Sequence, residues 1–148
     1  MKRVVVAIDH SAVSRSLMDA AFDLAAREKD VTLYFFHAVE PLRTGWRSRS
    51  KEIDEVLLAK VRKEVHDWVH AAAAEFGKPL QDLRVAVRPG FPAEAILDFA
   101  DGVAADLIMI GHRGNPERKR FVLGSVAAEV VAHATCSVYV HRPRVLGE

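Results

Sequence analysis

The chain has 148 residues, of which 50% are hydrophobic and 28% are charged, as expected for one soluble globular domain with a sizeable core. Its formal net charge is only +1, so no general attraction to nucleic acid or to a membrane surface follows. The single cysteine, Cys136, excludes an intrachain disulfide, and neither a Cys/His metal cluster nor an apolar stretch of membrane-spanning length is visible. Because the N-terminus also lacks a signal-peptide pattern, we expect a cytoplasmic protein.

The first third of the chain predicts two strands separated by a helix. Residues 4–8 form a continuous run of Val, Ala and Ile, which is typical of a central parallel strand buried on both faces. A helix with one apolar stripe follows, and Ser14 is its candidate cap. Residues 31–39 predict the second strand, which ends before Pro41.

A basic loop is expected at residues 42–51, where Arg43, Arg47, Arg49 and Lys51 surround a glycine and a tryptophan. Two interpretations stay open. The loop is either a solvated connection or a lid whose arginines meet phosphate groups.

The rest of the chain continues the alternation of helices and strands. A long helix is predicted over residues 52–76, an alternating edge strand over 83–88, a helix from Pro92, and a buried strand over 106–110. A helix capped by Ser125 and a last strand over 136–141 complete the series. This order predicts an α/β fold: a single domain, residues 1–148, with an open five-stranded parallel sheet and helices on both faces, as in Rossmann-like proteins.

In such a sheet the winding reverses beside the first strand, and ligands bind there beyond the carboxyl ends of the strands. Asp9 follows the first strand and Gly111 follows the fourth, so both are expected to border one crevice. Gly111 begins a glycine pattern that continues through Gly114 to Gly124-Ser125. The chain has neither a Walker loop nor a dinucleotide fingerprint. The glycines either form turns only or allow a phosphate to approach the helix start.

Several stretches together resemble the universal stress protein family. The pattern G-x2-G-x9-G-S from Gly111 to Ser125 matches its nucleotide-binding signature, and residues 4–11 match its opening strand and D-x-S turn. Residues 105–111, 124–126 and 136–140 match its later segments. The resemblance covers nearly the whole chain. It implies a fold like that of the adenine nucleotide alpha hydrolases and ATP as the ligand, with Mg²⁺ or Mn²⁺ as an optional companion.

The resemblance also implies a role for each matching residue. Asp9 would meet the ribose or adenine, beside Ala7 and Ile8, and the Val39 backbone would contact the adenine. The glycine loop would surround the ribose and phosphates, and the start of the next helix would donate N–H groups to the phosphates. The expected nucleotide-binding set is Ala7, Ile8, Asp9, Val39, Ile110, Gly111, His112, Arg113, Gly114, Gly124, Ser125 and Val126.

Two departures from the family pattern stand out. Ser137 takes the place of a frequent proline in the last strand, and residues 115–121 are unusually charged. Arg118, Lys119 and Arg120 either form a solvated face or pair with phosphates. Among the histidines, His37 is expected in the core, whereas His10 and His112 are expected to be polar loop residues beside the crevice.

The resemblance therefore implies an ATP-binding regulatory protein that acts through protein partners. The alternative is an interaction module of the same fold that does not use nucleotide. No nucleophile–base pair is visible, so any ATP hydrolysis would be slow. An ATP pyrophosphatase or adenylyl transferase is disfavoured because Asp9-His10-Ser11 lacks the S-G-G-x-D-S loop of those enzymes. The last strand lies at an expected sheet edge, and Val138, Tyr139 and Val140 would form a homodimer contact there.

Overall fold

The computed structural model describes residues 2–41, 51–112 and 123–143, with the backbone alone for residues 51–54. Strands and helices alternate along these ranges. In chain order the elements are β1 (Lys2–Ala7), α1 (Ala12–Arg27), β2 (Val31–Val39), α2 (Lys51–Phe76), β3 (Asp82–Pro89), α3 (Pro92–Gly102), β4 (Leu107–Gly111), α4 (Ser125–His133) and β5 (Ser137–His141).

The five described strands form one parallel sheet in the order β3-β2-β1-β4-β5. The predicted fold class is confirmed. β1 lies at the centre and pairs with β2 on one side and with β4 on the other. The chain therefore reverses its direction of winding beside β1, and the ends of β1 and β4 meet at one edge, as expected.

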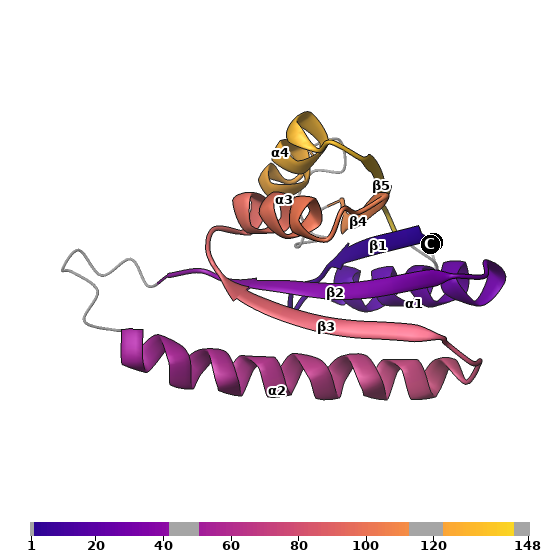
Figure 1. Cartoon of the computed structure of the whole chain (residues 1–148), viewed down its shortest axis with the longest axis horizontal. Coiled ribbons are helices and arrows are strands. Elements are labelled where there is room, and N and C mark those ends of the chain that lie inside the picture. Colours follow the sequence, from indigo (N-terminus) through magenta and orange to yellow (C-terminus); the bar gives the residue numbers. More distant parts are fainter. Residues whose placement is uncertain (1, 42–50, 113–122, 144–148) are drawn as a thin grey trace, which may run out of the picture.

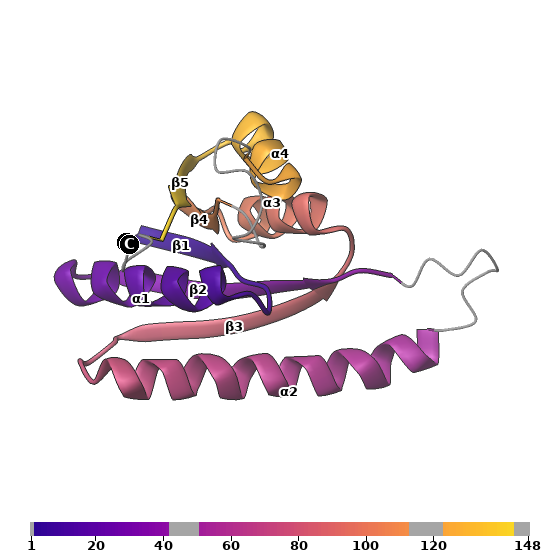
Figure 2. The same ribbon diagram turned by 180° about the vertical axis from the view of Figure 1, so that it is seen from behind.

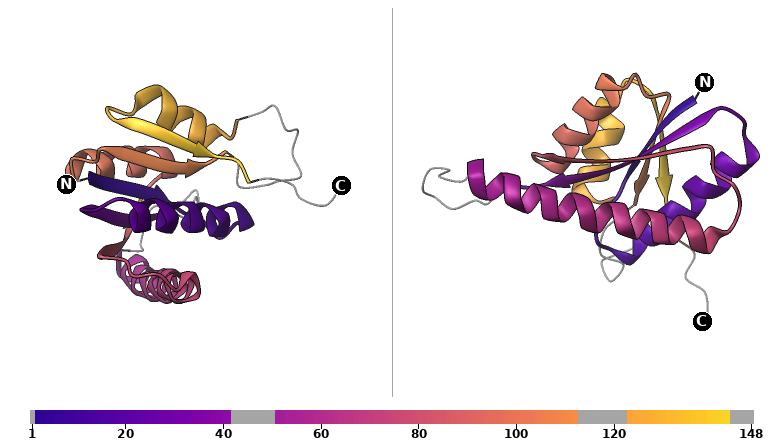
Figure 3. Two further views of the ribbon diagram at one scale, coloured as in Figure 1. Left: turned by 90° about the vertical axis from the view of Figure 1, so that its right-hand side faces the viewer. Right: turned by 60° about the horizontal axis from the view of Figure 1, so that its bottom comes forward.

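Helices cover both faces of the sheet. α1 and α2 lie on one face, and α3 and α4 lie on the other (Figures 1 and 2). The end view in Figure 3 separates these layers, and its second panel shows α2 crossing the molecule in front of the sheet. Helices on both faces are the usual consequence of right-handed crossovers between parallel strands.

Alternation of side chains along β1 builds two separate cores. Val4 and Val6 join the core under α1 and α2, whereas Val5 and Ala7 join the core under α3 and α4. All three valines are fully buried. Because successive residues of a strand point to opposite faces, an uninterrupted apolar run is what a doubly covered central strand requires.

Two predicted helix caps are wrong by a few residues. Ser11, and not Ser14, is the N-cap of α1, and its hydroxyl accepts a hydrogen bond from the Ser14 N–H at 3.3 Å. Gly124, and not Ser125, is the N-cap of α4, and Ser125 is its first helical residue. Two residues that favour caps lie near each helix start, Ser11 and Ser14 at α1 and Gly124 and Ser125 at α4, and sequence alone does not say which one of each pair is the cap.

Candidate functional site

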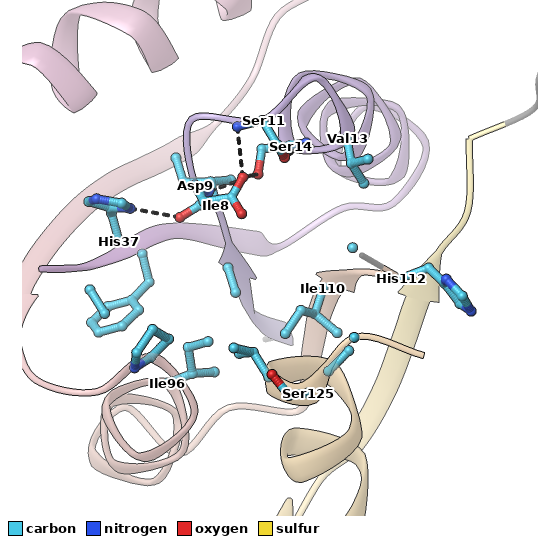
Figure 4. Close-up of a pocket in the computed structure, with 18 of the residues that line it drawn as sticks. Ile8, Asp9, Ser11, Val13, Ser14, His37, Ile96, Ile110, His112 and Ser125 are labelled. Atoms are coloured by element: carbon cyan, nitrogen blue, oxygen red, sulfur yellow. Dashed lines mark hydrogen bonds between the residues drawn. The ribbon is translucent and has the colours of Figure 1, made fainter. Parts of the chain in front are cut away.

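A cavity of about 590 Å³ lies beyond the carboxyl ends of β1, β2 and β4. Figure 4 shows that its walls come from the β1–α1 turn, from α3 and from the start of α4. A volume of this size suits a small-molecule ligand such as a nucleotide. Its described lining residues are Ala7, Ile8, Asp9, Ser11, Val13, Ser14, Phe36, His37, Ala38, Pro92, Ile96, Ile110, Gly111, His112, Leu123, Gly124, Ser125, Val126 and Ala127.

One wall of the cavity is apolar and is continuous with the core under α3 and α4. Ala7 and Ile110 are paired in register on neighbouring strands, and both are buried. Phe36 lies on the next strand and stacks on Phe99 with ring centroids 4.7 Å apart. Ile96 of α3 closes this side. A flat apolar group such as a heteroaromatic base would remove this wall from water.

The opposite wall presents a carboxylate that the β1–α1 turn holds in place. One oxygen of Asp9, Oδ1, accepts hydrogen bonds from the Ser11 N–H and the Ser14 hydroxyl, both at 2.8 Å. The Ser14 hydroxyl in turn accepts the Asp9 N–H at 2.7 Å. In Figure 4 the other carboxylate oxygen faces the open side of the cavity. Asp9 is therefore pre-oriented to accept hydrogen bonds from a ligand.

The same hydrogen bonds keep Asp9 ionised. Burial works to raise the pKa of its carboxyl, but the hydrogen bonds from Ser11 and Ser14, helped by the charge of His37, bring that pKa below its ordinary value. A carboxylate that accepts several hydrogen bonds is stabilised in its charged form. The cavity thus carries a fixed negative charge at neutral pH.

His37 lines the cavity and is only half-buried, so the expectation of a core residue is wrong. Its Nδ1 lies 2.9 Å from the Ile8 carbonyl oxygen, which requires that Nδ1 carry the hydrogen and donate it. This bond ties the end of β2 to the residue before Asp9. His10 is exposed, with its ring 5.0 Å from that of His37 and stacked at 6.3 Å on Trp68.

The third wall joins the end of β4 to the start of α4. The Gly124 N–H donates to the His112 carbonyl at 2.9 Å, and the His112 N–H donates to the His141 carbonyl at 2.8 Å. Gly124 is the N-cap and has no side chain to occupy the N–H groups of the first turn of α4. The N-terminus of a helix attracts anions through these groups and through its dipole.

The structure brings together most of the residues that the sequence analysis expects at the site. Val39 is not among the lining residues, and its carbonyl oxygen accepts the Gly90 N–H at 2.9 Å. Arg113 and Gly114 lie outside the described residues, as do Arg118, Lys119, Arg120 and loop residues 42–50. Of the residues expected to bind nucleotide, those that line the cavity are Ala7, Ile8, Asp9, Ile110, Gly111, His112, Gly124, Ser125 and Val126.

Sequence reasoning missed most of the apolar wall. Phe36 and Ala38 share the face of β2 that carries the core under α3 and α4, and the two-residue period of a strand could have indicated this. Pro92 and Ile96 lie one helical turn apart on α3. No local motif marks these two residues, because only the packing of α3 against β2 brings them to the cavity.

The described residues also limit two other kinds of feature, a metal site with three or more protein ligands and a membrane-spanning helix. No group of three or more His, Cys, Asp or Glu side chains in the described part of the chain is placed to hold a metal ion. No helix within the described ranges is both long and apolar enough to span a bilayer.

The chain is similar to known proteins along most of its length. Residues 1–142 match the model of the universal stress protein family. A universal stress protein of Methanocaldococcus jannaschii is 31% identical over 152 residues, covering 94% of this chain and 81% of the relative.

Two solved structures share the fold. The universal stress protein UspA from Lactobacillus plantarum superposes with a TM-score of 0.76 at 22% identity, covering 95% of this chain and 97% of that chain. The universal stress protein from Archaeoglobus fulgidus, solved in complex with dAMP, gives a TM-score of 0.61 at 26% identity, covering 95% of this chain and 97% of that chain.

Proposed function

Because this chain belongs to the universal stress protein family, we propose that it binds an adenine nucleotide, ATP, in the cavity between the ends of β1 and β4. The observation that carries the proposal is the arrangement of three different walls around one cavity. An apolar wall, a fixed carboxylate and a helix N-terminus surround a volume of about 590 Å³. The dAMP complex of the Archaeoglobus fulgidus relative supports the same ligand class.

Each wall suits one part of the nucleotide. The adenine lies against Phe36 and Ile96, and Asp9 accepts hydrogen bonds from the ribose hydroxyls. The phosphates lie at the first turn of α4, where Ser125 is exposed. Gly114 and Arg113 lie outside the described residues, and the family resemblance implies a phosphate contact for both. Mg²⁺ or Mn²⁺ accompanies the phosphates when present.

The proposed biological role is regulation through nucleotide occupancy in the cytoplasm. The protein senses or carries ATP and acts through protein partners as a homodimer joined at β5. Hydrolysis, where it occurs, is slow, since the proposed role requires no catalytic base or nucleophile.

Calorimetric titration of the full chain with ATP tests the proposal. Asp9→Asn and Ser125→Ala should each weaken ATP binding several-fold while the circular dichroism spectrum stays unchanged. Asp98→Asn is the matched control, because Asp98 is exposed on α3 and does not line the cavity. Asp9→Asn should weaken the binding of ATP more than the binding of inorganic triphosphate, because triphosphate has no ribose.

The alternative, an interaction module that does not use nucleotide, has a distinct result. Protein purified from cells and then denatured should release ATP or ADP in near-stoichiometric amount. Absence of nucleotide in that extract, together with no heat on addition of ATP, favours the interaction module and overturns the proposal.

A further inference from the structure

The exposed face of α2 carries two histidines one helical turn apart. His66 and His70 occupy positions i and i+4, which are neighbours on a helix surface. Their ring centroids are 4.1 Å apart, the shortest separation among the described aromatic and imidazole ring pairs. Both residues are exposed. α2 contributes no residue to the described lining of the cavity, so this pair is separate from the proposed nucleotide site.

We propose that His66 and His70 form a two-histidine site for a divalent transition-metal ion of the Zn²⁺ or Cu²⁺ class. Imidazole nitrogens are preferred ligands of these ions. Two of them on one rigid helical turn bind as a chelate, since the backbone has already fixed their separation. Water or a side chain from another molecule fills the remaining coordination positions.

A neighbouring carboxylate orients one of the two rings. Asp67 Oδ1 lies 3.4 Å from His66 Nδ1, so that nitrogen carries the hydrogen and donates it to the carboxylate. The Nε2 lone pair of His66 is then the one that faces a metal. Metal-binding histidines commonly donate their second ring N–H to a carboxylate in this way.

Lys63 holds that carboxylate in turn. Its ammonium group donates to Asp67 Oδ2 at 2.9 Å. Asp67 is therefore held by Lys63 on one oxygen while its other oxygen faces the His66 ring.

The other close histidine pair is less suited to chelation. His10 and His37 come from different elements, and their rings meet edge to face with centroids 5.0 Å apart. The usual sequence pattern of a metal site has more than two Cys or His ligands, and His66 and His70 do not form such a pattern. Their four-residue spacing within a predicted helix was the available signal.

Titration of the full chain, without an affinity tag, with Zn²⁺ alone tests the proposal by calorimetry. The wild type should bind one Zn²⁺ per chain, and His70→Gln and His66→Gln should each weaken that binding at least tenfold. His133→Gln is the matched control, because His133 is exposed on another helix and should leave binding unchanged. Mg²⁺, which prefers oxygen ligands, should not compete.

A second readout separates chelation from loss of structure. Zn²⁺ should raise the melting temperature of the wild type, because a ligand that binds only the folded state stabilises it, and His70→Gln should lose that rise. Unchanged Zn²⁺ affinity in His70→Gln, or loss of binding in His10→Gln instead, would overturn the assignment.

Discussion

At the scale of single residues, the most consequential contact is the reciprocal pair formed by Asp9 and Ser14. The Ser14 hydroxyl accepts the Asp9 N–H and donates to the Asp9 carboxylate. Ser14 is buried, with 5% of its surface exposed. One serine therefore fixes both the backbone and the side chain of the residue that we assign to the ribose.

Ser14→Ala should lower the free energy of unfolding by about 1–3 kcal/mol, because the Asp9 N–H, part-buried in the structure, loses its acceptor. The loss should depend on pH. The folded-state pKa of Asp9 lies below its ordinary value of 3.8, so its stabilisation is present above that value and is lost as the pH falls through the folded-state pKa. Urea unfolding at pH 7 and at pH 3 should therefore show the larger difference between the variant and the wild type at pH 7.

Ser137→Ala is the control for this experiment, since Ser137 is exposed on β5 and its hydroxyl is not part of the Asp9 turn. A difference between Ser14→Ala and the wild type that stays constant from pH 7 to pH 3 would show that Asp9 is not held in its ionised form by Ser14.

At the scale of elements, β5 is one of the two edge strands of the described sheet, and it is the one that the proposed homodimer uses. It pairs with β4 on one side only, in the described sheet. Tyr139 on this strand keeps 44% of its surface exposed. An unpaired strand edge with apolar side chains favours pairing with another chain, and a two-fold axis would make that contact closed and isologous.

Tyr139→Lys should convert the proposed dimer to a monomer, because antiparallel pairing around a two-fold axis brings the two lysines close together. Light scattering at micromolar concentration measures the mass. Val131→Lys is the matched control, since Val131 is exposed to a similar extent, 48%, but lies on α4. A monomeric wild type, or a Tyr139→Lys variant that stays dimeric, would contradict a β5 interface.

Most of the elements and part of the cavity lining could be predicted from the sequence. The central strand β1 could be located because Val4 to Val6 belong to an apolar run without a break, which is typical of a doubly covered strand, whereas residues 83–88 could be located by their alternation. The parallel order followed from the alternation of elements. Asp9 and Gly111 could be placed at the site because they directly follow strands. Phe36 and Ile96 could not, since their side chains reach the cavity through contacts between elements distant in sequence.

At the scale of the whole molecule, the two cores differ in how much of the cavity they line: the core under α3 and α4 supplies most of the apolar lining, whereas Ile8 is the one buried member of the core under α1 and α2 among the described lining residues. The core under α1 and α2 contains Phe22, whose ring lies 5.4 Å from that of Phe35 and 5.6 Å from that of Phe76. The core under α3 and α4 contains Phe36, which also lines the cavity. Because Phe22 does not line the cavity, a change at this residue should affect stability alone.

Phe22→Leu and Phe36→Leu should each lower the free energy of unfolding by about 1–3 kcal/mol, as is common for core substitutions. Only Phe36→Leu should also change ATP affinity, by several-fold, since Phe36 forms part of the apolar wall. Urea unfolding and calorimetry on both variants measure the two effects. An equal loss of affinity in Phe22→Leu would show that the two cores are coupled through the sheet.

The central place of β1 has a consequence for synthesis. β1 is made first, and β2 reaches it early, but its other edge waits until residues 107–110 of β4 have left the ribosome. Until then β1 has one unpaired edge, although it is the central strand of the finished sheet. Its valines are fully buried in the finished protein, but they are not yet covered in the partly made chain. Partly made chains with unpaired strand edges are prone to aggregation. A ribosome that stalls before β4 therefore leaves a nascent chain that depends on chaperones.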